Sequence, residues 1–127
     1  MKFLYLAAGG GIGAILRYLV SIYSIKYMAY GFPIGTLMVN LIGSFLIGFA
    51  FVFLGREQIA INLKIFLFIG IFGSFTTFST YMFESLELFK NGMTKIAFLY
   101  IAISNIIGLA FVYFGFSLGE ILEKQVK

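Results

Sequence analysis

Four apolar runs occupy most of the chain and leave few folds open to it. They cover residues 3–25, 33–54, 63–89 and 96–119. Each is about as long as the roughly 20 residues that a helix needs to cross a bilayer. Because backbone polar groups in hydrocarbon must find hydrogen bonds within their own segment, we predict an all-α membrane protein with four transmembrane helices. The joints are short, so residues 1–127 are expected to form a single four-span transmembrane domain.

The composition supports this prediction and excludes other classes of protein. The chain is 61% hydrophobic, well above the roughly 45–50% of soluble domains. It has no Cys or His, and so lacks a thiol, an imidazole base and the usual zinc ligands. We therefore expect no enzyme. Basic residues form no cluster that would bind nucleic acid, and most of them lie beside the apolar runs, as in proteins surrounded by membrane lipid.

The charges beside the runs do not determine the orientation. An even number of spans puts five cations on one side and three on the other: Lys2, Arg56, Lys64, Lys124 and Lys127 against Lys26, Lys90 and Lys95. So small a difference leaves two alternatives, one weakly determined topology or insertion in both orientations. Insertion in both orientations would allow two copies to pair antiparallel, and an oligomer would help to enclose a hydrated path.

Hydroxyl groups are concentrated in the middle of the third run. Five of the seven residues from 74 to 80 are Ser or Thr, and Gly70 and Gly73 precede them. Ser and Thr can bond to the carbonyl one turn earlier, and glycine weakens a helix. We therefore predict a break near residues 73–77, which would free carbonyls for a cation and amides or hydroxyls for an anion. The alternative is that these small residues pack one helix against another. This alternative explains any single Ser or Thr well, but it explains the whole cluster less well.

Other side chains extend this polar region. The second run has a polar residue at every fourth position, namely Thr36, Asn40 and Ser44. This spacing predicts a polar stripe on the second helix, which either forms hydrogen bonds between helices or lines a pore. A shorter patch in the fourth run has the same two interpretations; it comprises Tyr100, Ser104 and Asn105. The third run also has an aromatic at every third position, which predicts a loose stripe whose electropositive ring edges can meet a small anion; its members are Phe75, Phe78 and Tyr81.

Charged and small residues inside the runs have two interpretations each. Arg17, in the first run, either reaches the interface or faces a vestibule, where it would raise the local anion concentration. Glu84 lies deeper in the third run than Glu87, which can be an ordinary surface pair with Lys90. The glycines at 9–13 superficially match a dinucleotide-binding motif. Without a preceding strand, they instead predict close helix packing through the pairs 9/13 and 10/14.

Three segments, in this order, resemble the Fluc (CrcB) family of fluoride channels over essentially the whole chain. They are GGIGAILRY at 10–18, GTLMVNLIGSF at 35–45 and GSFTTFSTY at 73–81. The resemblance implies an antiparallel, dual-topology homodimer in the plasma (inner) membrane of a prokaryote. It also implies two fluoride pathways and a central structural sodium ion at the break in the third helix.

The resemblance implies roles for individual residues as well. Backbone carbonyls of Gly73 and Thr76 from both subunits would hold the sodium. Asn40 and Phe78 would contact fluoride, Ser104 would line its pathway, and Arg17 would face the vestibule. A polar track farther along would comprise Thr36, Ser79, Thr80, Glu84 and Tyr100. Where the family usually has a second phenylalanine this chain has Tyr81, which keeps the ring edge and adds a hydroxyl.

We therefore expect a passive, fluoride-selective channel that exports fluoride from the cytoplasm. Neutral donors can replace the water around fluoride without binding it too tightly to be released. The alternative is a small four-span multidrug exporter that exchanges protons for drugs. Such an exporter would need an acidic residue in the first helix, but the first run contains Arg17 and no acidic residue. A third possibility is a non-transporting subunit, in which Asn40→Ala and Phe78→Ala would weaken the dimer but change no flux.

Overall fold

The computed structural model describes residues 1–24, 26, 31–55 and 58–126, and over these residues the chain is helical with no strand. The elements are α1 (Lys2–Ser24), α2 (Ile34–Leu54), α3 (Ile61–Lys64), the π-helix η2 (Ile65–Phe72), α4 (Gly73–Phe75), α5 (Phe78–Lys90) and α6 (Thr94–Val126). Four segments are long and apolar enough to cross a membrane: Lys2–Ser24, Ile34–Leu54, Ile61–Lys90 and Thr94–Gln125. The predicted set of four spanning helices is confirmed.

The predicted bounds agree with the helices except at one end. The fourth run was expected to end at residue 119, whereas α6 continues to Val126. Glu120 and Lys124 stand one turn apart in this extension, a spacing that supports a helix in water. The apolar window thus ends before the helix does. The end of the first run at residue 25, and the cations Arg56 and Lys127, lie outside the described residues.

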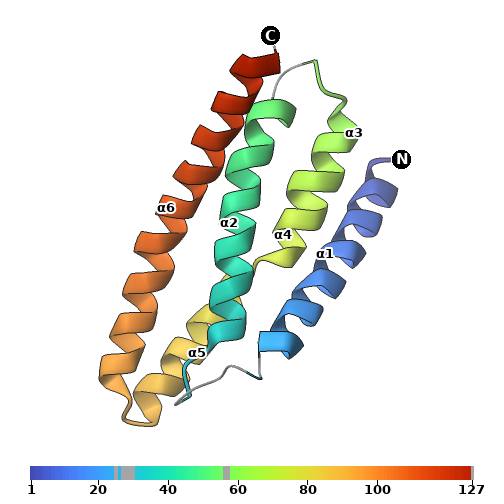
Figure 1. Cartoon of the computed structure of the whole chain (residues 1–127). Coiled ribbons are helices and arrows are strands. Elements are labelled where there is room, and N and C mark those ends of the chain that lie inside the picture. Colours follow the sequence, from blue (N-terminus) through green and yellow to red (C-terminus); the bar gives the residue numbers. More distant parts are fainter. Residues whose placement is uncertain (25, 27–30, 56–57, 127) are drawn as a thin grey trace.

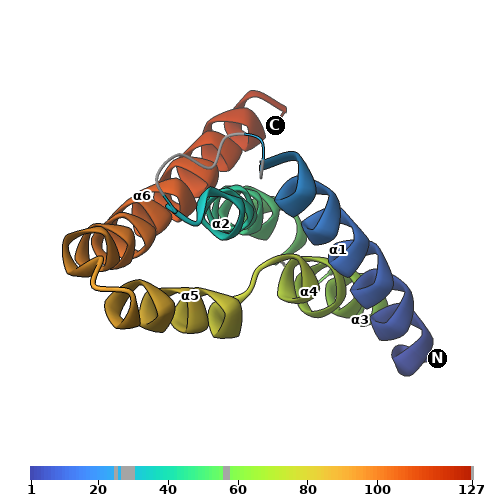
Figure 2. The same cartoon turned by 90° about the horizontal axis from the view of Figure 1, so that it is seen from below.

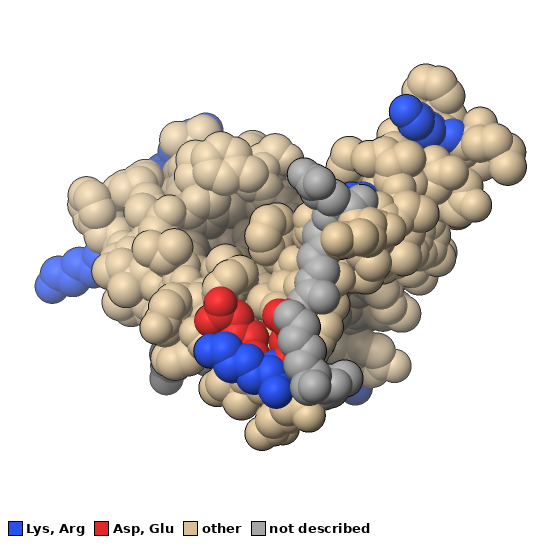
Figure 3. Space-filling model, turned by 90° about the horizontal axis from the view of Figure 1, so that it is seen from above, with Lys and Arg blue, Asp and Glu red and all other residues tan. Residues whose placement is uncertain are grey.

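The helices form a bundle with both termini at one end, together with the end of α2 and the start of α3 (Figure 1). Seen along the bundle, η2 and α4 lie beside α1, whereas α5 is displaced sideways and lies beside α6 (Figure 2). The third span therefore contacts a different neighbour with each of its halves. At the end that carries the C-terminus, Lys and Arg side chains stand at separate points and most of the face is uncharged (Figure 3).

Glycines bring α1 against the first half of the third span. A Cβ on Gly9 would meet the carbonyl of Phe66, and one on Gly13 would meet the carbonyl of Ile71. Only residues without a side chain allow two backbones to approach so closely. The predicted packing role of Gly9 and Gly13 is confirmed, and the dinucleotide alternative has no place in a helix of this kind.

The helices α2 and α6 run parallel, and glycines set their register. Gly48 packs against the backbone at Val112, and Gly108 faces the hydroxyl of Ser44, at the same offset in sequence. Followed toward the start of each helix, these contacts bring the turn that carries Ser104 near the turn that carries Asn40, and the turn of Tyr100 near that of Thr36. This register brings the predicted polar stripes of the second and fourth runs to similar levels of the bundle.

Candidate functional site

The third span is interrupted between α4 and α5 by two residues with extended backbone. Thr76 has φ −78° and ψ 158°, and Thr77 has φ −148° and ψ 117°. Thr76 still bonds back into the preceding turn, its hydroxyl donating to the carbonyl of Phe72 at 2.9 Å. The Thr77 hydroxyl caps the next helix, accepting from the backbone N–H of Thr80 at 3.4 Å. Each threonine thus serves a different helix end.

Asn40 of α2 binds the interruption at its centre. Its Oδ1 accepts from the backbone N–H of Thr77 at 2.8 Å, and its Nδ2 donates to the carbonyl of Thr77 at 3.1 Å. One amide side chain therefore satisfies both backbone groups that the extended residue withdraws from helical bonding. The amide has a second N–H, and within the described residues that N–H has no acceptor.

Gly43, one turn after Asn40, makes room for the interruption. A Cβ at this position would meet the methyl group of Thr76, and it would lie 3.3 Å from the ring of Phe75. Several carbonyls beside the interruption remain free: among the described residues no backbone N–H donates to the oxygen of Gly73 or Thr76, nor to those of Ser74 and Phe75 between them. Oxygens of this kind are what a hard cation such as sodium takes as ligands.

A cavity of about 310 Å³ opens beside the interruption. Its polar lining comes from two helices and includes Asn40, Ser44, Thr76 and Thr77, and its aromatic lining comprises Phe68, Phe72 and Phe78. None of the described residues that line it is charged. The cavity therefore offers amide and hydroxyl groups and ring edges at mid-span, without a fixed charge.

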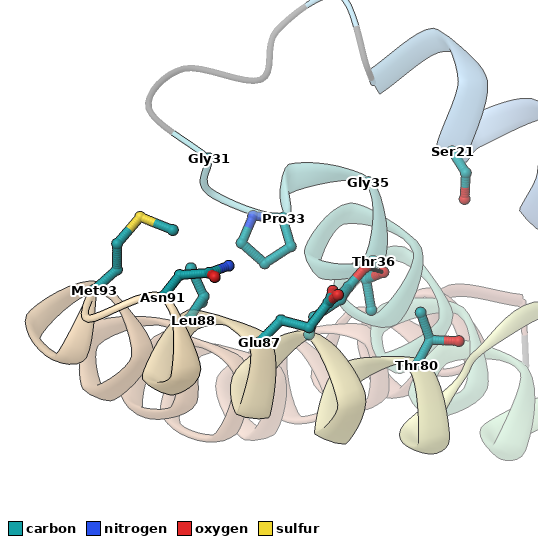
Figure 4. A pocket seen from close by; sticks show the side chains of 11 residues that line it. Ser21, Gly31, Pro33, Gly35, Thr36, Thr80, Glu87, Leu88, Asn91 and Met93 are labelled. Carbon is teal, nitrogen blue, oxygen red and sulfur yellow. Dashed lines mark hydrogen bonds between the residues drawn. The ribbon is translucent and has the colours of Figure 1, made fainter.

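A second polar group surrounds Glu84 on α5. The hydroxyl of Thr36 donates to Oε1 of Glu84 at 2.7 Å, and the hydroxyl of Tyr100 donates to Oε2 at 2.8 Å. This group borders a cavity of about 530 Å³, which Thr80 and Glu87 also line. In Figure 4 the side chains of Thr36, Thr80 and Glu87 lie along it between α2 and α5. Three predicted members of the polar track thus form one hydrogen-bonded group, in which Thr36 and Tyr100 both donate to Glu84.

The predicted aromatic stripe of the third run holds for Phe78 and Tyr81 but not for Phe75. Its spacing assumed one continuous helix, but α4 ends at Phe75 and α5 begins at Phe78. Phe75 is buried on one side of the interruption, Phe78 is 73% exposed on the other, and Tyr81 is only 5% exposed. Two aromatics of α5 still approach each other, with the rings of Phe78 and Tyr81 5.9 Å apart. Tyr81 packs edge-on against Tyr100 with its ring centre at 5.2 Å.

The remaining predicted residues lie at different distances from these cavities. The hydroxyl of Ser104 is buried and has no hydrogen-bond partner in the part of the chain that the structure describes. Ser79 is exposed on the first turn of α5. Arg17 is half-buried on α1 and lines neither cavity, although Ser21, one turn later, reaches the larger one.

Sequence reasoning missed three contributions. Thr77 was counted as one hydroxyl among five, yet its backbone is what Asn40 binds. Gly43 was not singled out, although a glycine one turn after a polar residue on a predicted stripe is a signal of close approach. Asn105 was placed in a polar patch without a partner; its Nδ2 donates to the hydroxyl of Tyr81 at 2.9 Å.

The fold and this site define a multi-pass membrane protein with a polar, uncharged cavity at the depth of the bilayer. The family model described as "CrcB-like protein, Camphor Resistance (CrcB)" matches residues 4–116. The chain belongs to the CrcB family.

Relatives of similar length carry a channel name. A protein of Parabacteroides distasonis named "Fluoride-specific ion channel FluC" is 42% identical over 127 residues, 100% of this chain and 99% of the relative. Relatives with the same name come from Hydrogenobaculum sp., 43% identical over 123 residues (96% and 100%), and Aquifex aeolicus, 42% over 118 (91% and 94%). Ion channels are transport proteins, in agreement with the expectation that the chain is no enzyme.

Proposed function

We propose that this protein is a passive, fluoride-selective ion channel. The observation that carries the proposal is the cavity at the interruption: its described lining is uncharged and includes Asn40, one N–H of which has no acceptor among the described residues. Fluoride is small and only accepts hydrogen bonds, so neutral donors can replace its water. A fixed cation in the pore would hold the ion, whereas conduction requires release. Relatives named as fluoride channels over the full length of the chain support the same function.

The fluoride pathway that we propose uses Asn40, Phe78, Tyr81 and Ser104 first. It continues along the polar track of Thr36, Ser79, Thr80, Glu84 and Tyr100, with Arg17 in the vestibule. Along the track the hydroxyls of Thr36 and Tyr100 already donate to Glu84. They serve fluoride only when they rotate away from the carboxylate. The carboxylate thus holds these donors in place between ions.

The working unit that we propose is an antiparallel homodimer with two pathways. Gly73 and Phe78, on either side of the interruption, are exposed in the single chain, and a polar break facing lipid would be costly. A second copy on this face would cover it. Because the chain has no Cys, a single Lys2→Cys variant reports orientation: about half of the copies should label from each side of the membrane. Labelling from one side alone would contradict dual topology.

A structural sodium ion fits the same face. The free carbonyls of Gly73 and Thr76 would hold it from both subunits, and its charge would neutralise the negative ends of these carbonyl dipoles. Protein prepared with potassium in place of sodium is then expected to lose its dimer or its flux and to regain both when sodium returns. Equal stability and flux in both salts would remove sodium from the proposal.

The direction of transport follows from the membrane potential. In the plasma (inner) membrane of a prokaryote, an anion is driven outward by about 2.3 kcal/mol per charge per 100 mV, so export needs no coupled proton. Fluoride efflux from liposomes tests the function. Vesicles with the purified protein should lose fluoride far faster than empty vesicles, and equal loss would refute the proposal. Proton-coupled efflux of an organic cation would instead support the multidrug exporter.

A further inference from the structure

The hydroxyl of Tyr81 occupies an unusual position for a side chain in a membrane helix. The ring is only 5% exposed, and its edge-on packing against Tyr100 holds it in place. The hydroxyl oxygen is 2.9 Å from Nδ2 of Asn105 on α6. This contact holds the phenolic oxygen in position, as the ring packing holds the ring.

The bonds of Asn105 decide which atom of this pair gives the proton. Its Nδ2 also lies 2.8 Å from the carbonyl oxygen of Ile101, which can only accept. The atom facing Ile101 must therefore be the amide nitrogen, and Tyr81 accepts from the same nitrogen. Both amide protons are then used. The proton of Tyr81 has no acceptor among the described residues, so it remains available as a donor.

Two other donors without an acceptor among the described residues belong to neighbouring helices. Ser104 precedes Asn105 on α6 and has a buried hydroxyl without a partner in the described part of the chain. Asn40, on a turn of α2 near the turn of Ser104, keeps one N–H after binding Thr77. Among the described residues, three neutral donors from α2, α5 and α6 thus have no acceptor. A buried donor of this kind costs free energy until an acceptor binds it.

We infer that the hydroxyl of Tyr81 donates a hydrogen bond to the permeating fluoride, and that Asn105 is the positioning residue that turns this hydroxyl toward the ion. The inference rests on the proposed function and adds a specificity-determining contact to it. A phenolic O–H is a stronger donor than a ring edge. Tyr81 should therefore bind fluoride in preference to larger, less basic halides such as chloride.

The test compares fluoride efflux from liposomes for the unmodified protein, Tyr81→Phe, Asn105→Leu and the double variant, at several fluoride concentrations. Loss of one neutral hydrogen bond corresponds to a factor of about 3 to 10. Tyr81→Phe should raise the half-saturating fluoride concentration by about that factor and reduce the preference over chloride. Tyr113→Phe is the matched control, because Tyr113 is 68% exposed on α6; it should leave both quantities unchanged.

The double variant separates a positioning role from a structural one. If Asn105 acts through the tyrosine hydroxyl, Asn105→Leu weakens fluoride binding when residue 81 is Tyr and has no further effect when it is Phe. Equal effects of Asn105→Leu in both backgrounds would overturn the positioning role. Unchanged saturation and selectivity in Tyr81→Phe would overturn the inference while leaving the channel function intact. No fluoride efflux from the unmodified protein would instead refute the proposed function itself.

Discussion

The two polar groups of the bundle are made from similar side chains but use their donors differently. At the interruption, Asn40 satisfies the backbone of Thr77 and keeps one N–H free. One turn away on α2, Thr36 gives its only proton to Glu84, and Tyr100 does the same from α6. Among the described residues, the first group therefore has donors without acceptors and no charge, whereas in the second the hydroxyls of Thr36 and Tyr100 both donate to a carboxylate.

This difference teaches that a polar residue in a membrane helix does not reveal its role by its type alone. A buried donor that is already paired stabilises the bundle, and a buried donor that is unpaired costs free energy until something binds it. A site for an anion should be found where donors remain unpaired. The comparison predicts that substitutions in the two groups change flux and stability in different proportions.

The largest effect is expected from Asn40→Ala. It removes both bonds to Thr77 and leaves a backbone N–H and C=O unpaired inside the bundle, at a cost of about 2–4 kcal/mol of stability. Fluoride efflux should fall more than tenfold, since the donor and the geometry of the interruption are lost together. Thermal unfolding in detergent and liposome efflux measure the two effects. Asn62→Ala, near the start of the third span, is the control, and a near-normal Asn40→Ala channel would break the comparison.

Gly43→Ala tests the interruption without touching a donor. Its new methyl group would meet the side chain of Thr76 and press on Phe75. Overpacking of this kind costs about 1–3 kcal/mol, and the shift of Thr76 should reduce efflux severalfold. Gly11→Ala is the matched control, because a Cβ there meets nothing within 4 Å. If both variants unfold at the same temperature, close approach at Gly43 is not what shapes the interruption.

Tyr100→Phe probes the second group. One oxygen of Glu84 loses its donor, so stability should fall by about 1–2 kcal/mol. Because Tyr100 has no spare donor, we expect the effect on efflux to be smaller than that of Asn40→Ala. Unfolding temperatures and efflux rates are measured in parallel for both variants. They show how the loss of efflux compares with the loss of stability in each variant. A greater loss of efflux in Tyr100→Phe would place the limiting contact with fluoride at Glu84 rather than at the interruption.

Ser104→Ala should have the smallest effect on stability. It therefore separates the effect of a donor on fluoride efflux from its effect on stability most clearly. The hydroxyl has no partner to lose among the described residues, and its removal should change stability by less than about 0.5 kcal/mol. Efflux should nevertheless fall about threefold, the value of one neutral hydrogen bond to the ion. Unfolding curves and efflux together measure this. A variant with full efflux would show that the spare hydroxyl does not serve the ion.

Particular residues show how far the sequence alone could lead. The apolar runs predicted four spans, and the spacing of Gly9 and Gly13 predicted the packing of α1, because both patterns depend on chemistry within one segment. The family resemblance named Asn40, Thr36, Glu84 and Tyr100, but not that the last three bond to one another. The stripe through Phe75, Phe78 and Tyr81 failed at Phe75, because helical spacing cannot be extended across two extended residues.

The sequence by itself determined that this protein is a four-helix membrane protein with hydroxyls, glycines and aromatics at mid-span, since hydrocarbon allows few other structures to such a chain. Only the tertiary structure decided which polar groups are paired. Asn40 meets Thr77, and Asn105 meets Tyr81, through contacts between helices that lie far apart in the sequence. Those contacts decide whether a hydrogen-bond donor is already paired with an acceptor or remains unpaired. No local sequence pattern encodes them.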